Sequence, residues 1–454
     1  MNKDQVNKII NDPVYGFITL NKGILLDIID HPFFQRLSRI KQLGLTYLVY
    51  PGAHHTRFHH AIGSAYLMKQ AIQTLKEQGK EISTDEELGV TLAILLHDIG
   101  HGPFSHALEN SFVNGISHED ISLLFMNQLN KEFNGALDTA ISIFKDKYPK
   151  KFLHRLVSSQ LDMDRLDYLK RDSFFTGVSE GVVSNQRIIK MFAIANDEIV
   201  IKEKGIYSIE KFIVARRLMY WQVYLHKTVL SAEFLLSKII QRAKELIIAG
   251  EELFVSETMD VFLSKNVDAD MMSHPTFLKS FASLDDYDVF ACIKSWCLSE
   301  DKVIATMCNN LINRRLPKVK ISSQPFVKKE IQQLKNLHQK ELMFDNQQMN
   351  YFVYDEQMQN NAYDPRKDEI KILFKDGSLK DITDASDGTE DGVIKVETIV
   401  GGTNIEIARF GDGAGVVFNE NSADLDFRVE SNGNTHQFFV DGGTDNTMIG
   451  TSVN

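Results

Sequence analysis

The sequence predicts a mostly α-helical protein that ends in a small β-containing lobe and a β-rich tail. Apolar residues recur at intervals of three and four positions, for example across residues 205–245, as they do in amphipathic helices. Short β-branched and aromatic runs replace this pattern between residues 350 and 382. After about residue 385, glycine, asparagine and aspartate become frequent. We therefore expect three parts, which span residues 1–245, 246–385 and 386–454.

The first part, residues 1–245, is expected to be a helical domain. Residues 17–20 (FITL) follow a turn signal and fit either a strand or the start of a helix. We expect one helix to begin near Arg57. We expect the apolar run at residues 92–96 to open another helix, directly before His97.

The second part, residues 246–385, continues as amphipathic helices up to about residue 345. Residues 351–354 (YFVY) and 370–374 (IKILF) fit strands, and the dipeptide Asp376-Gly377 that follows is a hairpin-turn signal. We therefore expect a helical lobe with a small α+β region at its end.

The tail, residues 386–454, differs from the rest of the chain in composition. It holds eleven of the 27 glycines and carries a net charge of −9, from twelve acidic residues against Lys395, Arg409 and Arg428. Short β-prone runs such as residues 415–418 lie between turn residues. The tail resembles segments of phage tail-fibre proteins. A natural fusion, an assembly artefact and an addition made for expression all remain open, so the tail is kept out of the catalytic argument.

The charge balance argues against a general nucleic-acid-binding protein. The net charge of the whole chain is −11, and the first 385 residues carry only −2, whereas phosphate backbones recruit basic surfaces. The cysteines Cys292, Cys297 and Cys308 form no paired motif, which favours a reducing compartment. The first residues lack an apolar signal segment, and no run approaches the ~18 apolar residues of a membrane helix. We therefore expect a cytoplasmic protein without a membrane segment.

Histidine is concentrated in one stretch, because eight of the fourteen histidines lie between residues 54 and 118. The adjacent His97 and Asp98 can offer an imidazole nitrogen and a carboxylate oxygen to one cation, which suits borderline divalent metals. Two ligands are too few for such a site, and His60 upstream and Asp164 downstream are candidates that complete it. The set predicts a divalent metal cofactor, with Mn, Fe, Zn, Co and Mg all open.

The order of these residues, H … HD … D, resembles that of the HD superfamily of phosphohydrolases. Residues 30–64, with the motifs QRL, IKQLG and YPGA, and residues 97–106 are similar to the deoxynucleoside triphosphate triphosphohydrolase branch. That branch includes proteins that join a sterile-alpha-motif domain to an HD domain. The resemblance runs from about residue 11 to residue 318 and does not cover the tail. It implies a helical HD domain in which four side chains bind the metal: His60, His97, Asp98 and Asp164.

The same resemblance implies roles for residues around the metal. Four of them would face the phosphates or assist proton transfer: His101, His106, His118 and Glu119. We expect His101 one helical turn after His97, on the same face. Seven would contact the nucleotide substrate: Gln42, Arg57, Arg165, Tyr168, Asp172, Arg216 and Tyr224. Water would then attack the α-phosphorus and release a deoxynucleoside and inorganic triphosphate.

A further group lies where the resemblance places an activating nucleotide between subunits of a homodimer or homotetramer: Asp30, Arg187, Lys202, Lys204, Arg314 and Lys318. The sequence departs from the family at two nucleotide-contacting positions. Ser38 stands in place of a guanosine-contacting arginine, and Leu225 stands in place of a substrate-pocket glutamine. These departures leave the base preference of both nucleotides open.

Structural explanations compete with several of these assignments. His118 and Glu119 also fit the first turn of a helix that is capped by Ser117. The adjacent His54 and His55 fit surface or supporting positions better than ligand positions. The lysines of the activator group, taken alone, also fit a solvated surface.

Three functions remain open on the sequence. Asp162 and Asp167 compete with Asp164 as ligand, and only the register of the family resemblance picks Asp164. We favour a dNTP triphosphohydrolase. A phosphodiesterase or phosphatase that acts on another nucleotide would use the same metal without releasing triphosphate. A nucleotide-sensing protein with vestigial hydrolysis is disfavoured because all the ligands are present. The tail would add a virion or adhesion role if residues 386–454 trimerised on their own.

Overall fold

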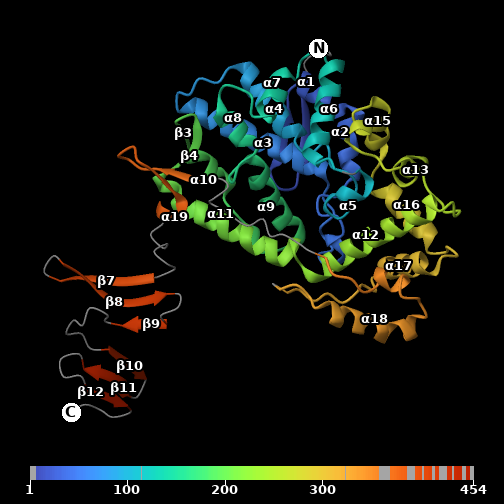
Figure 1. Cartoon of the computed structure of the whole chain (residues 1–454). Coiled ribbons are helices and arrows are strands. Elements are labelled where there is room, and N and C mark those ends of the chain that lie inside the picture. Colours follow the sequence, from blue (N-terminus) through green and yellow to red (C-terminus); the bar gives the residue numbers. More distant parts are fainter. Residues whose placement is uncertain are drawn as a thin grey trace. The chain divides into compact units, whose positions relative to one another are not determined.

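The computed structural model describes residues 7–113, 115–322, 324–356 and 369–385, and six strands within the tail. Helices predominate and the sheets are small, which confirms the predicted fold class (Figure 1). The chain divides into two compact units, Met1–Leu379 and Lys380–Asn454. Among the described residues, no helix has the length and apolar character needed to cross a membrane.

The large unit begins with a hairpin of β1 (Lys8–Asp12) and β2 (Gly16–Leu20), which pair antiparallel. Residues 17–20 therefore form a strand. The Asp12 side chain accepts hydrogen bonds from the backbone N–H groups of Val14 and Tyr15, which closes the turn. This turn places the Asp12 carboxylate in the interior, where it is 3% exposed.

Helices follow in close succession and form the core around the site. They are α1 (Ile24–Asp30), α2 (Pro32–Gln35), α3 (Arg57–Glu77), α4 (Thr84–Leu96), α5 (Ser105–Phe112), α6 (His118–Glu132), α7 (Asp138–Phe144), α8 (Lys151–Val157), α9 (Met163–Thr176) and α10 (Asn185–Lys190), with 3-10 segments η2 (Arg36–Arg39), η3 (Thr46–Leu48) and η4 (Ser179–Gly181). Helix α3 begins at Arg57 as predicted and packs against α4 and α9. The site lies where these three helices meet.

The apolar run at residues 92–96 ends helix α4, so the prediction that it opens a helix is wrong. The helix begins earlier, where the Ser83 side chain accepts from the Glu86 backbone N–H and the Glu86 side chain accepts from that of Ser83. Residues 97–100 then form a turn. A Cβ at Gly100 would lie 2.1 Å from the His118 carbonyl oxygen, so this turn lies directly against the start of α6.

The second half of the large unit is also helical. It contains 3-10 segment η5 (Glu203–Gly205), α11 (Ile206–Met219), π-helical segment η6 (Tyr220–Tyr224), α12 (Lys227–Ile248), α13 (Glu257–Leu263), α14 (Ala269–Met272), α15 (Pro275–Ser283), α16 (Asp286–Trp296), α17 (Lys302–Ile312) and α18 (Lys328–Leu342). The long helix α12 packs against α5 and α17 (Figure 1). It also runs through the expected boundary at residue 245, and the three-part division of the chain stays a prediction.

A small sheet joins distant segments of the large unit. Strands β3 (Phe192–Ala195) and β4 (Glu198–Lys202) form a hairpin, and β5 (Lys371–Leu373) pairs parallel with β4. The predicted strand at residues 370–374 is thus confirmed. The turn after it is also confirmed, because Gly377 has a φ of +86° and donates to the Phe374 carbonyl.

Residues 351–354 do not form the predicted strand. Segment η7 (Gln348–Tyr351) is a 3-10 helix, and its aromatic neighbours dock on side chains of α12. The Lys238 ammonium lies 4.8 Å from the Tyr354 ring centroid, and the Tyr351 hydroxyl hydrogen-bonds Glu245. The β-prone composition of this run therefore reflects packing of aromatic rings and not strand pairing.

The small unit is β-rich as predicted for the tail. Near its start lie β6 (Leu379–Asp381) and the short helix α19 (Ile382–Ala385). Two three-stranded antiparallel sheets follow, one of β7 (Ile394–Val400), β8 (Thr403–Gly411) and β9 (Gly415–Phe418), and one of β10 (Phe427–Ser431), β11 (Asn434–Asp441) and β12 (Asn446–Ile449). Each sheet is a meander of consecutive strands.

Candidate active site

His60 lies in the first turns of α3 and is completely buried. Its Nδ1 atom is 2.7 Å from Asp167 Oδ2, so this nitrogen donates to the carboxylate. Its Nε2 atom therefore faces inward, 3.1 Å from Asp164 Oδ1. In the adjacent residue, His59, Nδ1 accepts from the Thr56 backbone N–H, which gives His59 a capping role at the start of α3.

His97 and Asp98 lie directly after the last residue of α4. His97 Nδ1 is 2.6 Å from the Ile94 carbonyl oxygen, so it donates there, and Nε2 faces Asp164 Oδ1 at 3.5 Å. Asp98 Oδ1 lies 3.3 Å from the same Nε2 atom. Asp98 Oδ2 accepts from Arg57, which leaves Oδ1 directed at the histidines.

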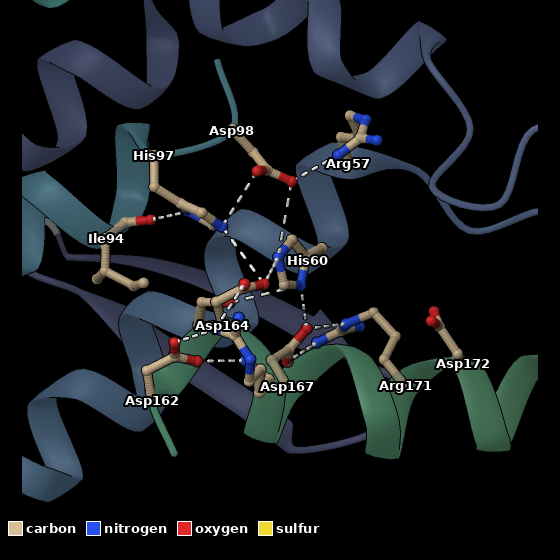
Figure 2. A network of polar contacts seen from close by, with 12 residues as sticks. Arg57, His60, Ile94, His97, Asp98, Asp162, Asp164, Asp167, Arg171 and Asp172 are labelled. Atoms are coloured by element: carbon tan, nitrogen blue, oxygen red, sulfur yellow. Dashed lines mark hydrogen bonds and ion pairs between the residues drawn. The ribbon is translucent and has the colours of Figure 1, made fainter. Parts of the chain in front are cut away.

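Three aspartates in and just before the first turns of α9 have different roles. Asp162 caps the helix by accepting from the Arg165 backbone N–H at 2.7 Å. Asp167 holds the outer nitrogen of His60. Asp164 alone among the three lies within 4 Å of both histidine Nε2 atoms, and Figure 2 shows the two rings converging on it.

The donor set fits a divalent metal ion. Ligand atoms of His60, His97 and Asp164 all lie within 4.8 Å of one another. Among the described residues, Nε2 of His60 and Nε2 of His97 are buried without a hydrogen bond of good geometry. In both rings the outer Nδ1–H donates to an oxygen, which leaves the lone pair of Nε2 directed into the cluster, as in metal sites whose histidines are oriented by a supporting acceptor.

When no cation is bound, the protonation of the histidines and aspartates sets the net charge of the cluster. Burial opposes the charged form of His60, but Asp164 and Asp167 together raise its pKa to about 10. Burial likewise opposes ionisation of Asp164, but the two histidines hold the pKa of its carboxyl well below the usual value. A cation and these protons therefore compete for the same space.

A buried network supports His60 from behind. Asp167 also accepts from Arg171 Nε at 2.9 Å, and Arg171 Nη1 donates to Asp12 Oδ2 at 2.8 Å. A Cβ at Gly63 would lie 2.1 Å from Asp167 Oδ1 and 2.2 Å from Arg171 Nη2, so only glycine admits this pair beside α3. Sequence reasoning missed this support. Its signals were a glycine in a helix interior and the i, i+4 spacing of Asp167 and Arg171.

His101 lies beside the cluster, but not on the helix that was predicted. It follows the turn at residues 97–100, and its Nε2 atom is 3.4 Å from Asp98 Oδ1. The His101 and His118 rings stack with centroids 3.9 Å apart. Burial, and then the charge of Arg57, lower the pKa of His101 well below its usual value, so its ring is neutral.

Helix α6 places His118 in its first turn. Ser117 accepts from the Asp120 backbone N–H at 3.1 Å, which confirms the capping interpretation. Glu119 lies exposed in the same turn, and a proton-transfer role for either residue stays a prediction. His106 lies in α5, but its side chain is outside the described residues.

A buried arginine that the sequence did not suggest holds the loop of His101. Arg36 donates to the Ile99 carbonyl at 2.8 Å and to the His101 carbonyl at 2.7 Å. Its guanidinium lies 5.5 Å from the Phe125 ring centroid and 5.2 Å from that of Phe281. Two parallel N–H bonds to backbone oxygens fix the turn that carries Asp98 and His101.

The predicted nucleoside-contacting residues extend from the metal cluster along α9. Asp164, Tyr168 and Asp172 follow at intervals of four and share one helix face. Tyr224 in segment η6 reaches this face, since its hydroxyl donates to Asp172 Oδ2 at 2.8 Å and its ring lies 6.1 Å from that of Tyr168. Burial is the first cause that raises the pKa of both tyrosines, so both hydroxyls keep their protons.

The remaining predicted contacts flank this face. Arg165 pairs with Asp162, and its Nε atom is buried without a hydrogen bond among the described residues. The Oε1 atom of Gln42 is likewise buried without a hydrogen bond among the described residues. Arg216 on α11 donates to Gln160 at 2.7 Å and lies 6.0 Å from the Tyr220 ring centroid. Of these residues, Arg165 approaches the cluster, because its Nη1 atom lies 4.0 Å from Asp164 Oδ2.

The six residues of the predicted activator group lie in several different segments, and Arg187, Asp30 and Arg314 have different partners. Arg187 on α10 donates to Ser208 at 3.0 Å and to the Lys204 carbonyl at 3.2 Å, which places it beside Lys204. Lys202 ends β4 close by in sequence. Asp30 pairs with Lys8 at 2.6 Å, and both side chains are about half exposed. Two exposed residues complete the group: Arg314, which donates to the Leu48 carbonyl at 2.9 Å, and Lys318.

Comparison with known families agrees with this geometry. Residues 57–171 match the HD domain, and residues 183–266 match the HD associated region. The first match contains His60, His97, Asp98 and Asp164. The second begins after α9 and covers α10, α11, α12 and α13.

Individual relatives include one solved structure. A phosphohydrolase from Bacteroides thetaiotaomicron VPI-5482 has 52% sequence identity and a TM-score of 0.82, over 84% of this chain and 95% of that chain. An uncharacterized protein of Bacillus subtilis is 35% identical over 68% of this chain and 71% of the relative. A deoxynucleoside triphosphate triphosphohydrolase homolog of Dictyostelium discoideum is 33% identical over 54% of this chain. The match spans 51% of that relative, about half its length.

Proposed function

Because this chain belongs to the HD-domain family of metal-dependent phosphohydrolases, we propose that it hydrolyses deoxynucleoside triphosphates to deoxynucleosides and inorganic triphosphate. Relatives from Dictyostelium discoideum and Gallus gallus are named for the deoxynucleoside triphosphate triphosphohydrolase activity. Support within the chain comes from a metal cluster that continues along α9 into a row of tyrosines and an aspartate.

The metal would be held by His60 and His97 through Nε2 and by the carboxylates of Asp98 and Asp164. A divalent cation there supplies Lewis acidity, which makes water a competent nucleophile near neutral pH. The chain's own contribution is orientation. Asp167 fixes the ring of His60, and Arg57 fixes the carboxylate of Asp98.

Phosphate recognition falls to the cationic and neutral donors around the cluster. Arg57 and Arg165 lie next to the metal-facing carboxylates Asp98 and Asp164 and would neutralise charge that spreads over the phosphate oxygens. His101 is held neutral and close to Asp98, so its ring would face the phosphates as a hydrogen-bonding group without charge.

The nucleoside would lie toward the far end of α9. Asp172 is eight residues beyond Asp164, which corresponds to about 12 Å along a helix. A carboxylate repels the triphosphate and attracts hydroxyl donors, so this end suits the sugar. The edge of Tyr168 and the ring of Tyr224 would enclose the deoxyribose and leave little room for a 2′-hydroxyl.

The observation that carries the proposal is the pair of buried Nε2 atoms, on His60 and His97, that face one Asp164 oxygen without hydrogen bonds. The test is product analysis. Purified protein is incubated with each dNTP and each rNTP, with Mn²⁺ or Mg²⁺, and with or without an added activating nucleotide. Products are then resolved by ion exchange. We expect a deoxynucleoside and intact triphosphate.

Two other outcomes would contradict the proposal. Release of a monophosphate with pyrophosphate, or turnover of ribonucleotides alone, would place the enzyme with phosphodiesterases or phosphatases of the same family. The control is the double variant His97→Ala/Asp98→Ala, which should abolish the turnover. Unchanged turnover in that variant would reject the site itself.

A further inference from the structure

His55 is a buried histidine that the reaction described above does not use. It is 2% exposed, whereas its neighbour His54 is exposed and stacks on Tyr47 at 5.0 Å. The His55 ring stacks on Phe175 of α9 with centroids 4.5 Å apart and planes 16° apart. Its Nε2 atom lies 2.7 Å from Asp172 Oδ1.

Asp172 is therefore held on both sides. His55 donates to one oxygen, and the Tyr224 hydroxyl donates to the other at 2.8 Å. All three groups are buried or nearly so, and Asp172 is 1% exposed. Two donors from different segments fix the carboxylate plane, and each oxygen keeps one lone pair for a ligand.

The second ring nitrogen of His55 leaves Nε2 as the atom that contacts Asp172. Nδ1 is buried and has no hydrogen bond among the described residues. Nε2 faces a carboxylate oxygen, which accepts hydrogen bonds, so Nε2 carries the N–H and His55 serves as a fixed donor to Asp172.

The loop that carries His55 is built to hold it in place. A Cβ at Gly52 would lie 2.4 Å from the Phe175 carbonyl oxygen, so the loop packs directly on the end of α9. Tyr50 donates from its hydroxyl to the Gln222 carbonyl in η6 at 2.5 Å. The His55 carbonyl accepts from the Gln42 backbone N–H at 3.0 Å. One loop thus joins α9 and η6, which the proposed function assigns to the nucleoside, to the segment of Gln42.

We propose that His55 is a positioning residue that aims the Asp172 carboxylate at the 3′-hydroxyl of the bound deoxynucleotide. This inference rests on the proposed function. A deoxynucleoside 5′-triphosphate has one free sugar hydroxyl, and a carboxylate held by two donors accepts one further O–H with fixed geometry. Recognition of that hydroxyl then depends on the hydrogen bond from His55, although His55 does not touch the substrate.

The test compares one dNTP with its 2′,3′-dideoxy counterpart on the full chain with Mn²⁺. We expect the wild-type kcat/KM to favour the hydroxyl-bearing substrate by about 10- to 100-fold, as for a hydrogen bond to a charged group. His55→Met keeps ring-sized bulk but no donor and should remove most of this preference. His55→Gln offers an amide N–H in place of Nε2 and should keep the preference within about threefold. The matched control His54→Met should leave both substrates unaffected.

Several results would overturn the role of His55. One is an unchanged preference in His55→Met, and another is an equal loss in His55→Gln and His55→Met, which would indicate packing alone. An independent readout is the tautomer of His55, taken from ¹⁵N-histidine spectra of wild type and assigned with His55→Gln. A proton on Nδ1 and none on Nε2 contradicts the inference whatever the activity. Absence of dNTP turnover in the wild type overturns the proposed function and with it the sugar contact, whereas turnover without the preference overturns only the role of His55.

Discussion

The metal cluster and the predicted activator group are both collections of charged side chains, yet the structure treats them differently. In the cluster, His60, Asp167 and Arg171 are buried, and each is fixed by a partner that is itself buried. In the activator group, Arg187 and Asp30 are exposed, and their partners are local surface groups. Buried charges need several well-oriented partners, whereas exposed charges need none. The metal cluster is therefore preorganised within one chain. The activator group is not, and it would need a second subunit to enclose a ligand.

The largest expected effect is on the metal cluster itself. Asp164→Ala removes the carboxylate that faces both histidine Nε2 atoms. We expect loss of bound metal and a fall in turnover of at least about 10³-fold, because water would no longer be activated. Metal content by elemental analysis and steady-state rates measure both. Full metal content with normal rates would place the ion elsewhere.

The second-largest effect is expected for the residues that support the metal ligands without binding the metal. Asp167→Asn weakens the acceptor for His60 Nδ1 and should lower metal affinity by about 10- to 100-fold, as other supporting partners do. Asp162→Asn, on the same helix, is the matched control. It keeps a capping side chain at the start of α9, because Asn and Asp cap helices about equally well, and it does not touch His60, so it should change affinity far less. Metal titration of both variants measures the difference, and equal losses would remove the special role of Asp167.

Glu233 is a buried acid that belongs to neither the metal cluster nor the activator group, and it should make the stability of the protein depend on pH. Burial alone raises the pKa of Glu233 on α12 to about 7, above the usual value of 4.5. The folded protein therefore binds this proton more tightly than the unfolded chain, so its contribution to stability is present at pH 4.5 and is lost as the pH rises through 7. Glu233→Gln should flatten this dependence. Thermal unfolding of wild type and variant from pH 5 to pH 8 tests it, and parallel curves would contradict it.

The smallest effect is expected in the activator group. Arg187→Ala removes an exposed side chain and should change the free energy of unfolding by less than about 0.5 kcal/mol. If the group binds an activating nucleotide between subunits, the variant should lose stimulation by added nucleoside triphosphate. Rates with and without that nucleotide measure the response. Equal stimulation in wild type and variant would contradict the assignment.

The sequence revealed the metal cluster because its chemistry restricts the residue types. His60, His97, Asp98 and Asp164 stand in an order that few other functions require. Supporting contacts were not visible in the same way, because they join segments far apart in the chain. Arg171 reaches Asp12 across 159 positions. The sequence predicts a surface or supporting position for His55, and only the contact with Asp172 identifies the group that it supports.

Two secondary-structure predictions are wrong because the composition of a short run does not show what that run packs against. The apolar run at residues 92–96 predicts the opening of a helix, although the capping pair Ser83 and Glu86 lies upstream of it. Residues 351–354 have β-prone side chains, but they pack on α12 and pair with no strand in the described part of the chain. The local sequence pattern indicates which residues are buried. Whether they form a helix or a strand depends on the segment against which they pack.

The central claim is that four side chains from three helical segments hold one divalent ion. Crystals grown with Mn²⁺ allow this to be measured by anomalous scattering at the manganese edge. The account predicts one strong peak about 2.1 Å from Nε2 of His60 and of His97 and from a carboxylate oxygen of Asp98 and of Asp164. A map with no peak among these four side chains, from protein supplied with excess metal, would contradict it.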